Sequence, residues 1–309
     1  MDQGYDGLET RTTEARQKDL EERLVTLLRH AQSLPFWAER LGPPLGAGNH
    51  TGQDAPRALA QVPVTPAAVL RQAQAARPPW GGLLAMEPDR LRRVHLHRGL
   101  TLAEGWQPDP WRFARGLWAA GLRLDGLALS LLSWQAGPGA AMVDTGAAAI
   151  GAAVLHAGPG RRASALTAIR SLRPAVIIAT PDQMADLAPE LGPQRWALVG
   201  AAVPAALRHL GHAVHSLYAT AELGLIGYET TAPARLVLEE HILVELLDAT
   251  NQPVPPGTLG RVVVTSLDID QPLLRLDTGD LARWALGPNP CGRTNRALAQ
   301  PIVKAATVG

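Results

Sequence analysis

Between residues 106 and 220, apolar segments of two kinds alternate along the chain. WRFARGLWAAGL and ALTAIRSL have helical spacing, whereas ALSLLSW and AVIIAT are short, continuously apolar runs typical of buried strands. RWALVGA, residues 204–210 and AVHSLYA repeat the same unit. Strands that are buried on both faces and separated by helices form a mostly parallel sheet. The sequence therefore predicts an α/β fold with helices covering that sheet.

Different patterns flank this alternation. Apolar residues at three- and four-residue intervals over residues 14–32 predict an amphipathic helix, and Thr65 with Pro66 is a typical N-cap and first turn of another. After residue 231, short β-type runs separated by turns predict a small antiparallel sheet or barrel. We therefore divide one large domain into a helical segment packing on the sheet, an α/β core, a small β-subdomain and a loosely ordered tail: residues 1–95, 96–232, 233–287 and 288–309.

The charge and cysteine content exclude several classes of protein. The 29 basic and 28 acidic residues nearly balance, so neither nucleic acid nor an acidic membrane surface is an expected partner. The N-terminus is polar, and the small-residue run around Asp144 is interrupted by charge, glycine and proline, so we expect no secretory segment and no membrane span. The lone Cys291 suits a reducing compartment. Together these features predict a cytoplasmic protein.

Several segments, taken in order, resemble the phenylacetate-CoA ligase branch of the adenylate-forming superfamily. LPFWAERL and VPVTPAAVLR are similar to its opening helices, and HSLYATAELG resembles its Y-G-x-T-E motif. The closest match is residues 239–284, which contain LRLDTGDLARW, and NPCGRT resembles the segment before the family's hinge. The match is weakest at about residues 81–115. The resemblance implies the large N-terminal domain of such a ligase, with residues 96–232 as its nucleotide-binding core and without the C-terminal lid.

The resemblance implies chemistry in which ATP and Mg²⁺ activate a carboxylic acid as an acyl-adenylate, after which CoA displaces AMP. Asp280, in T-G-D, would accept hydrogen bonds from the ribose hydroxyls, or it satisfies turn amides. Glu222 would lie near the phosphates and hold Mg²⁺, or it is a favourable charge at a helix N-terminus.

The remaining site assignments also come from the resemblance. Tyr218 would line the nucleotide pocket, although an aromatic residue that ends a strand is as often part of the core. Gly200 and Ala201 match the backbone that approaches adenine. Trp134 and Gln135 follow a predicted strand near the acyl pocket, although a core or interface tryptophan is the favoured alternative.

Two departures affect the phosphates. The stretch VHLHRGLTLAEGW, residues 94–106, lacks the hydroxyl-rich phosphate loop of the family; its His95, His97 and Arg98 would contact an anion or belong to a half-exposed edge strand. Ala221 replaces a hydroxyl-bearing threonine, for which neighbouring Thr220 would substitute in part. Losing a hydrogen-bond donor to a charged oxygen costs about 1.5–3 kcal/mol.

Two further departures concern the end of the sequence. No G-R-x-D-D hinge or lid follows CGRT, and Lys304 is expected to be an exposed tail charge rather than the adenylation lysine. A missing cation over the reacting phosphate would slow adenylation by orders of magnitude. Only Cys291 remains of the cysteines that hold zinc in some relatives, with Asn289 at the partner position, so we predict no zinc.

Two functions follow from these observations. The first is a phenylacetate-CoA ligase-like enzyme, an AMP-forming acid-thiol ligase for an aromatic or related carboxylate, impaired or dependent on a separate lid-bearing chain. The alternative is a non-catalytic pseudoenzyme that binds a nucleotide, a CoA thioester or a protein partner. Exposed apolar surface where a lid normally packs would favour self-association. The absence of G-x-S-x-G and G-x-G-x-x-G turns argues against a hydrolase or a dehydrogenase.

Overall fold

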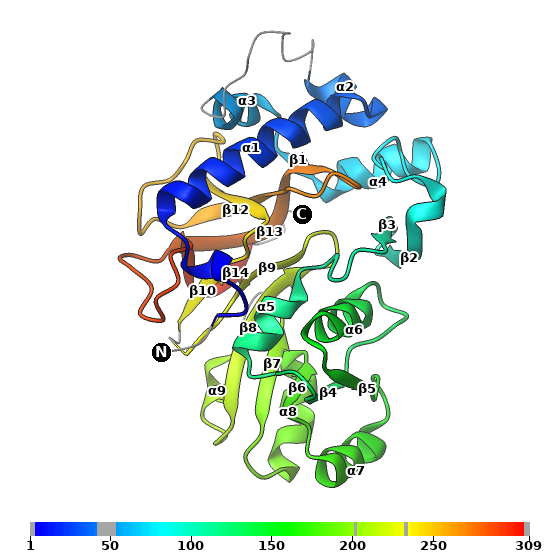
Figure 1. Cartoon of the computed structure of the whole chain (residues 1–309), viewed down its shortest axis with the longest axis vertical. Helices are drawn as coiled ribbons and strands as arrows, with labels where there is room; N and C mark the ends of the chain where they lie inside the picture. The colour runs from blue at the N-terminus through cyan, green and yellow to red at the C-terminus, as the bar shows by residue number, and fades with distance from the viewer. Residues whose placement is uncertain (1–3, 42–53, 201–202, 232–233, 306–309) are drawn as a thin grey trace. The chain divides into compact units, whose positions relative to one another are not determined.

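The chain forms two compact units, each assembled from segments that are separated in the sequence. The computed structural model describes residues 4–41, 54–200, 203–231 and 234–305. Unit 1 contains Met1–Thr10, Gln107–Glu239 and Trp284–Val303, and unit 2 contains Arg11–Trp106, Glu240–Arg283 and Lys304–Gly309. Figure 1 labels the helices and strands of both.

A parallel sheet forms the centre of unit 1 (Figure 1). Five strands lie in the order β5, β4, β6, β7, β8, and each is parallel to its neighbours. The antiparallel strands β9, β10 and β14 extend the sheet beyond β8. The bounds are β4 Leu127–Ser130, β5 Ala153–His156, β6 Val176–Ala179, β7 Arg195–Val199, β8 Ala213–Thr220, β9 Gly224–Tyr228, β10 Arg235–Leu238 and β14 Ala297–Lys304.

Helices pack on both faces of this sheet. On one face α7 (Arg162–Leu172), α8 (Pro181–Leu187) and α9 (Ala205–Arg208) bury apolar side chains against Ile177 and Trp196. Because side chains alternate along a strand, Leu217 points to the other face, where its Cδ2 atom would lie 2.9 Å from a Cβ placed on Gly116 of α5 (Phe113–Ala119). Strand β6, which precedes α8, is buried along its whole length, as its continuously apolar sequence predicts.

The helix α6 (Gly139–Ile150) packs directly on α5. A Cβ atom on Gly146 would lie 2.7 Å from Phe113 Cβ and 2.9 Å from the backbone nitrogen of Ala114. The two helices can therefore approach this closely only because position 146 has no side chain.

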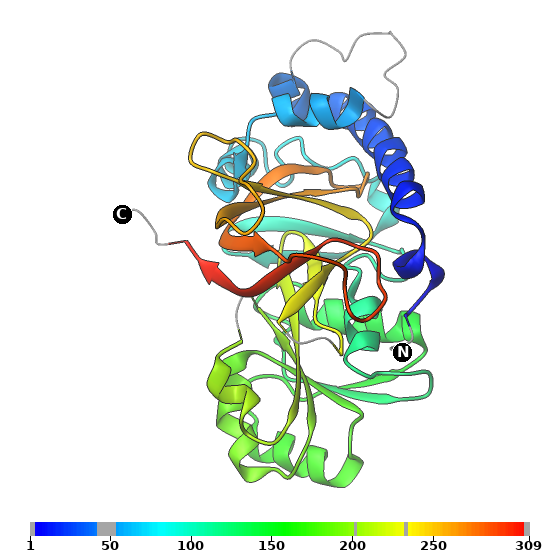
Figure 2. The ribbon, with the colours of Figure 1, turned by 90° about the vertical axis from the view of Figure 1, so that its left-hand side faces the viewer.

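Unit 2 combines helices with an antiparallel sheet. β11 (Ile242–Leu247), β12 (Gly260–Ser266) and β13 (Leu273–Trp284) pair antiparallel, and the short β1 (Thr65–Pro66) pairs parallel with β13. The long helix α1 (Thr13–Gln32), blue in Figure 2, packs on α2 (Pro35–Leu41) and α3 (Ala55–Gln61). The remaining elements are α4 Ala67–Ala76 and the separate hairpin of β2 Leu91–His97 and β3 Leu100–Gly105.

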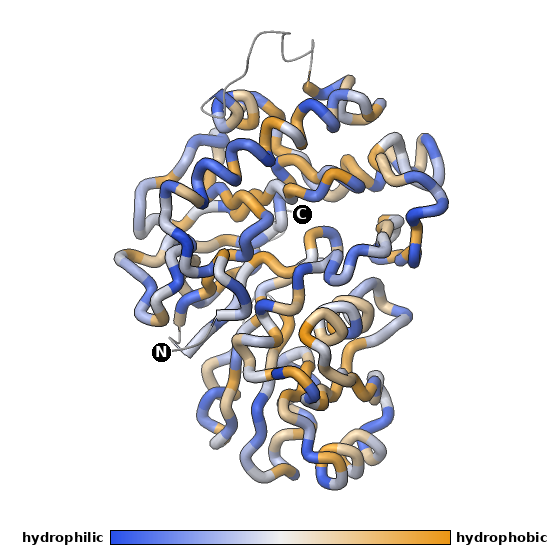
Figure 3. Tube along the Cα trace, viewed as in Figure 1, coloured by the Kyte–Doolittle hydropathy of each residue, from blue (hydrophilic) through white to orange (hydrophobic). Residues whose placement is uncertain are grey.

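Hydropathy follows this arrangement. In α1 the buried residues are mainly apolar, among them Leu24, Leu27 and Leu28, while hydrophilic residues occupy its other positions, blue in Figure 3. Among the residues that the structure describes, no helix combines the length and the apolar character that a bilayer crossing requires.

The predicted fold class is confirmed: a mostly parallel sheet covered by helices is joined in one chain to a small antiparallel sheet. Two local predictions are wrong. Residues 297–304 form β14 rather than a loose tail, because they pair with β10. Thr65 does not cap α4; it pairs with Leu276, and Pro66 is the N-cap. The four-segment division of the chain stays a prediction.

The close contact of α5 and α6 makes a testable prediction. Replacing Gly146 with alanine should lower the free energy of unfolding by about 1–3 kcal/mol, because overpacking forces the two backbones apart. This loss should appear even though a helix favours alanine over glycine by about 1 kcal/mol. Chemical denaturation measures it. Gly192→Ala is the matched control, since a Cβ there meets nothing within 4 Å. Equal stability of the two variants would contradict the packing described.

Candidate functional site

Most of the residues predicted for the site lie at one edge of the unit 1 sheet. Trp134 and Gln135 follow β4, Gly200 follows β7, and Thr220 ends β8. Because β4, β7 and β8 all run parallel, these residues gather at the carboxyl edge of the sheet, where open α/β sheets bind ligands. Glu222 lies in the turn that follows β8. Ala201 lies outside the described residues.

Gly200 leaves its backbone uncovered. Its N–H donates to the carbonyl oxygen of Leu217 at 3.0 Å, which fixes the end of β7 against β8. Its φ of +152° is one that side chains rarely adopt, and a Cβ there would meet nothing within 4 Å. Among the described residues, none outside the immediate chain neighbours therefore fills the space where a side chain at this position would stand.

The turn after β8 holds two polar side chains in different states. Thr220 Oγ1 accepts a hydrogen bond from Leu223 N at 3.2 Å, so its lone pairs are partly used while its hydroxyl proton can still be donated. Glu222 is half-buried and makes no hydrogen bond or ion pair with any residue that the structure describes. Its carboxylate is available to a ligand, and a hard oxygen donor of this kind fits Mg²⁺.

Tyr218 and Trp134 differ in exposure. Tyr218 is among the largest fully buried side chains, which favours the core alternative for this residue. Trp134 is 39% exposed, so it is not a core residue. Its ring lies 5.1 Å from that of His156, whose Nε2 is 3.5 Å from Asp144 Oδ1. Gln135, also exposed, accepts a hydrogen bond from Ser133.

In unit 2, Asp280 lies in β13 and its side chain is fully buried. Lys304 Nζ lies 2.7 Å from Asp280 Oδ1, while the lysine side chain is 71% exposed. Lys304 is therefore exposed, as expected, but its ammonium group pairs with the carboxylate predicted to bind the ribose, which the sequence did not indicate.

The β2–β3 hairpin contains residues 94–105, the stretch that resembles the position of the family's phosphate loop. Arg98 and Gly99 form its two-residue turn, both with positive φ. His95 is buried and its Nε2 lies 2.7 Å from Glu104 Oε2, while Arg93 reaches Oε1 of the same carboxylate at 2.5 Å. Glu104 is fully buried. The histidine therefore faces inward, and the apolar Val94 and Leu96 are exposed, which reverses the usual pattern of an edge strand.

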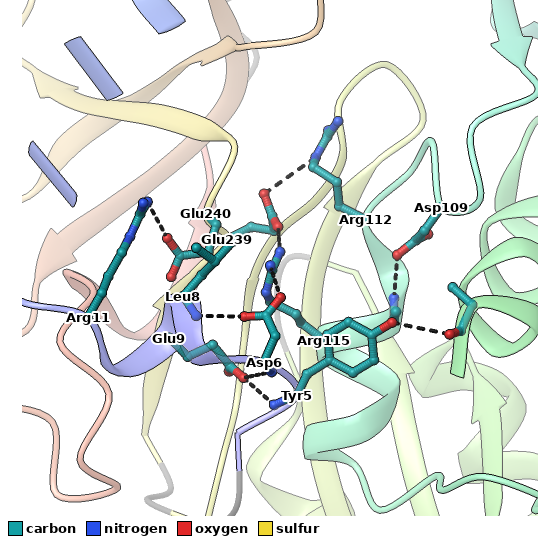
Figure 4. A network of polar contacts seen from close by, with 12 residues as sticks. Tyr5, Asp6, Leu8, Glu9, Arg11, Asp109, Arg112, Arg115, Glu239 and Glu240 are labelled. Carbon is teal, nitrogen blue, oxygen red and sulfur yellow. Dashed lines mark hydrogen bonds and ion pairs between the residues drawn. The ribbon is translucent and has the colours of Figure 1, made fainter. Parts of the chain in front are cut away.

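A buried polar network in unit 1 was not predicted from the sequence (Figure 4). Glu9, with no exposed surface, accepts hydrogen bonds from Tyr228 and Arg293. Burial, and then the Glu9 carboxylate, raise the pKa of Tyr228 well above its ordinary value, so the phenol stays a donor. Glu239 pairs with Arg115, which also contacts Asp6. These contacts join the N-terminal segment, α5 and β10.

Asp109 precedes α5 and belongs to the same network. Its carboxylate oxygens accept hydrogen bonds from Phe113 N at 3.0 Å and Ala114 N at 2.8 Å. Burial raises the pKa of Asp109 to about 6, and Glu239 adds to the increase, although the two backbone donors oppose it.

No cluster of three or more histidine, cysteine, aspartate or glutamate side chains suited to a metal occurs among the described residues. The absence of zinc nevertheless stays a prediction. Asn289, at the position of a family cysteine, donates hydrogen bonds to the carbonyl oxygens of Arg293 and Asn295 at 3.0 and 2.7 Å. An amide therefore holds together the loop that carries Cys291.

Solved structures provide the comparison with known proteins. The chain is similar to 2-hydroxyisobutyryl-CoA ligase solved in an open conformation with 2-HIB-AMP and CoA: the TM-score is 0.84 and the identity 25%, over 96% of this chain and 71% of that one. The thioesterification state of that ligase gives 0.83 and 25%, over 96% and 69%. VinN, at 17% identity and a TM-score of 0.50 over 70% and 62%, shows the fold alone.

No protein-family model matches the chain, and no curated protein does. The solved structures nevertheless confirm that the chain has the adenylate-forming ligase fold. They support the resemblance to that superfamily; the narrower likeness to phenylacetate-CoA ligase stays a prediction.

The buried ion pair of Glu9 and Arg293 makes a prediction about stability. Replacing Glu9 with glutamine should lower the free energy of unfolding by about 3–5 kcal/mol, because an uncompensated arginine is left buried. Denaturant titration measures the loss, and the exposed Glu14→Gln is the control. A loss no larger than that of the control would show that the pair contributes little.

Asp109 makes a prediction about pH. Because its folded pKa of about 6 exceeds the ordinary 3.8, the folded chain binds a proton between these values that the unfolded chain does not. This contribution to stability is present at low pH and is lost as the pH rises from about 4 to 6. Asp109→Asn cannot titrate, so its stability relative to wild type should rise by about 3 kcal/mol across that window. Parallel stability curves for the two proteins would contradict the shift.

Proposed function

We propose that this chain binds a carboxylic acid, or its thioester, together with an adenine nucleotide, and that it carries out acyl-adenylate and acyl-CoA-forming chemistry. The observation that carries the proposal is the likeness, over 96% of the chain, to a ligase solved with 2-HIB-AMP and CoA. Because one fold can host several functions, the proposal also depends on the polar groups retained at the predicted positions.

Each retained group has a role in this proposal. The Asp280 carboxylate would accept hydrogen bonds from both ribose hydroxyls. The uncovered backbone at Gly200 would lie against adenine, as would Ala201. Glu222, which has no other partner in the described part of the chain, would hold Mg²⁺ and the phosphates, with the Thr220 hydroxyl as a donor. Tyr218 would support the residues that line the nucleotide pocket without touching the nucleotide, because its side chain is buried.

An aromatic or related carboxylate is the acid proposed. The support is Trp134, a partly exposed indole next to His156 at the carboxyl end of β4, with the exposed Gln135 amide beside it in the sequence. Such a surface suits a planar apolar group. The 2-hydroxyisobutyryl-CoA ligase to which the chain is similar was solved with 2-HIB-AMP, so 2-hydroxyisobutyrate belongs in any substrate panel.

Catalysis by this chain alone is proposed to be slow. In the hairpin that stands where the family has its phosphate loop, Arg93 and His95 are bound to the buried Glu104. Freeing them would expose an unpaired buried carboxylate, which is costly. Phosphate charge that develops during adenylation therefore lacks the preorganised cations that supply most of the stabilisation in such sites. A separate chain that brings a lysine over the phosphates would compensate.

The same observation supports a second candidate function. With Arg93 and His95 committed to Glu104, and alanine at position 221, the chain would retain a seat for an adenylate or a CoA thioester without forming either. In that case it is a pseudoenzyme that binds a ligand or a protein partner.

Pyrophosphate release distinguishes the two functions. The purified chain should be assayed with ATP, Mg²⁺ and a panel that includes phenylacetate, benzoate and 2-hydroxyisobutyrate. We expect acid-dependent release far below the 1–10³ s⁻¹ typical of enzymes. No acid-dependent release at all would favour the pseudoenzyme, and release at an ordinary enzyme rate would contradict the proposed impairment.

Nucleotide binding tests the role of Asp280. Replacing it with asparagine should weaken AMP binding about 10- to 100-fold in isothermal titration, because a neutral amide replaces a charged acceptor of two hydroxyls. The exposed Asp89→Asn, in the same unit, should bind as wild type does. If both variants bind AMP equally well, Asp280 does not hold the ribose.

A further inference from the structure

The Asp280 carboxylate is not accessible to a ligand in this structure. Its side chain has no exposed surface, and the Nζ atom of Lys304 lies 2.7 Å from its Oδ1 atom. A ribose needs direct contact with the carboxylate oxygens to hydrogen-bond to them. Something must therefore move away from Asp280 before a nucleotide can bind there.

The backbone holds the covering segment in place. Ala305 N donates a hydrogen bond to the carbonyl oxygen of Gly279 at 3.0 Å, directly beside Asp280. On the other side, Asp280 N donates to Thr278 Oγ1 at 3.2 Å. Lys304, the last residue of β14, and Ala305 therefore lie beside the Thr278–Asp280 segment of β13, and the ion pair and this backbone hydrogen bond are among the contacts that hold them there.

The residue type suits a contact that can be released. The chain has 29 basic residues, and lysine occurs only at positions 18 and 304. An arginine would form a forked, bidentate pair with the carboxylate, whereas a lysine ammonium is a single, strongly hydrated charge on a flexible stem. Since the Lys304 side chain is 71% exposed, water can solvate its ammonium group once this group leaves Asp280. The pair is therefore weak enough for a ligand to displace.

We propose that Lys304 occupies the nucleotide seat of the unliganded protein, and that the ribose hydroxyls must displace its ammonium group from Asp280. This inference rests on the proposed function, in which Asp280 binds the ribose. Lys304 is then an autoinhibitory residue that lowers the apparent affinity for a nucleotide without contacting it in the bound state.

The size of the effect follows from a two-state equilibrium. Apparent affinity falls in proportion to the fraction of molecules whose seat is open. The Lys304 ammonium is exposed while the Asp280 carboxylate is buried, and an energy at the level of a solvent-screened pair corresponds to a reduction of about two- to sixfold at low salt. Salt screens the pair, so the reduction should shrink as ionic strength rises.

Titration with adenosine tests the proposal, because this ligand has a ribose but no phosphate that could attract the lysine. Lys304→Met should bind adenosine about two- to sixfold more tightly than wild type at low salt, and the difference should vanish at high salt. Lys304→Arg, which keeps a cation, should show no gain. Lys18→Met is the matched control, since it removes the only other lysine, an exposed one. Melting temperatures confirm that each variant is folded.

Three outcomes would overturn the inference in distinguishable ways. Equal or weaker adenosine binding by Lys304→Met, with Asp280→Asn still impaired, would overturn the inhibitory contact alone. A gain in affinity that also appears with 2′,3′-dideoxyadenosine would show that the lysine does not compete with the ribose. If neither wild type nor Lys304→Met binds adenosine or AMP at millimolar concentration, the proposed nucleotide seat fails, and the inference fails with it.

Discussion

The pairing of Glu104 with Arg93 and His95 sets the chemical limits of this protein. A fully buried carboxylate must keep its cationic partners, because an unpaired charge in the interior is far costlier than the pair. Two basic side chains of the hairpin, Arg93 and His95, are therefore engaged by this buried carboxylate. The Asp280 carboxylate, which we propose binds the ribose, is paired with the exposed Lys304. In our proposal the ribose hydroxyls replace the lysine at Asp280, so that carboxylate keeps its partners, whereas a phosphate cannot replace Arg93 and His95 at Glu104 because both groups are anions.

Most of the fold could be predicted from the sequence because the central strands are buried on both faces. Continuous apolar runs such as residues 176–179 leave few alternatives to a helix-covered parallel sheet. Residues 297–304 gave no such signal, because their strand forms through pairing with β10, which is distant in sequence. The prediction that Thr65 caps a helix was wrong for the same reason, because Thr65 pairs with Leu276. Non-local partners decided both cases.

The site could be predicted only in part. Motif order pointed to Gly200, Glu222 and Asp280, which stay predictions, but it could not show which carboxylates already have partners. The buried network around Glu9 left one trace in the sequence, since Arg112 and Arg115 interrupt an otherwise apolar helix and buried arginines need carboxylates. Nothing local indicated that the carboxylates would come from residues 9 and 239. Likewise, no sequence pattern around Lys304 indicated its contact with Asp280.

In our proposal the nucleotide seat keeps a carboxylate for the ribose, while Arg93 and His95 are engaged by Glu104. The most direct test is to compare the dissociation constants of adenosine, AMP and ATP under one set of conditions. If the cations near the phosphate position are committed to Glu104, each added phosphate should contribute little, and the three affinities should lie within a few-fold of one another. An affinity for ATP that exceeds that for adenosine by 100-fold or more would contradict this account, because such a gain requires cations that reach the phosphates.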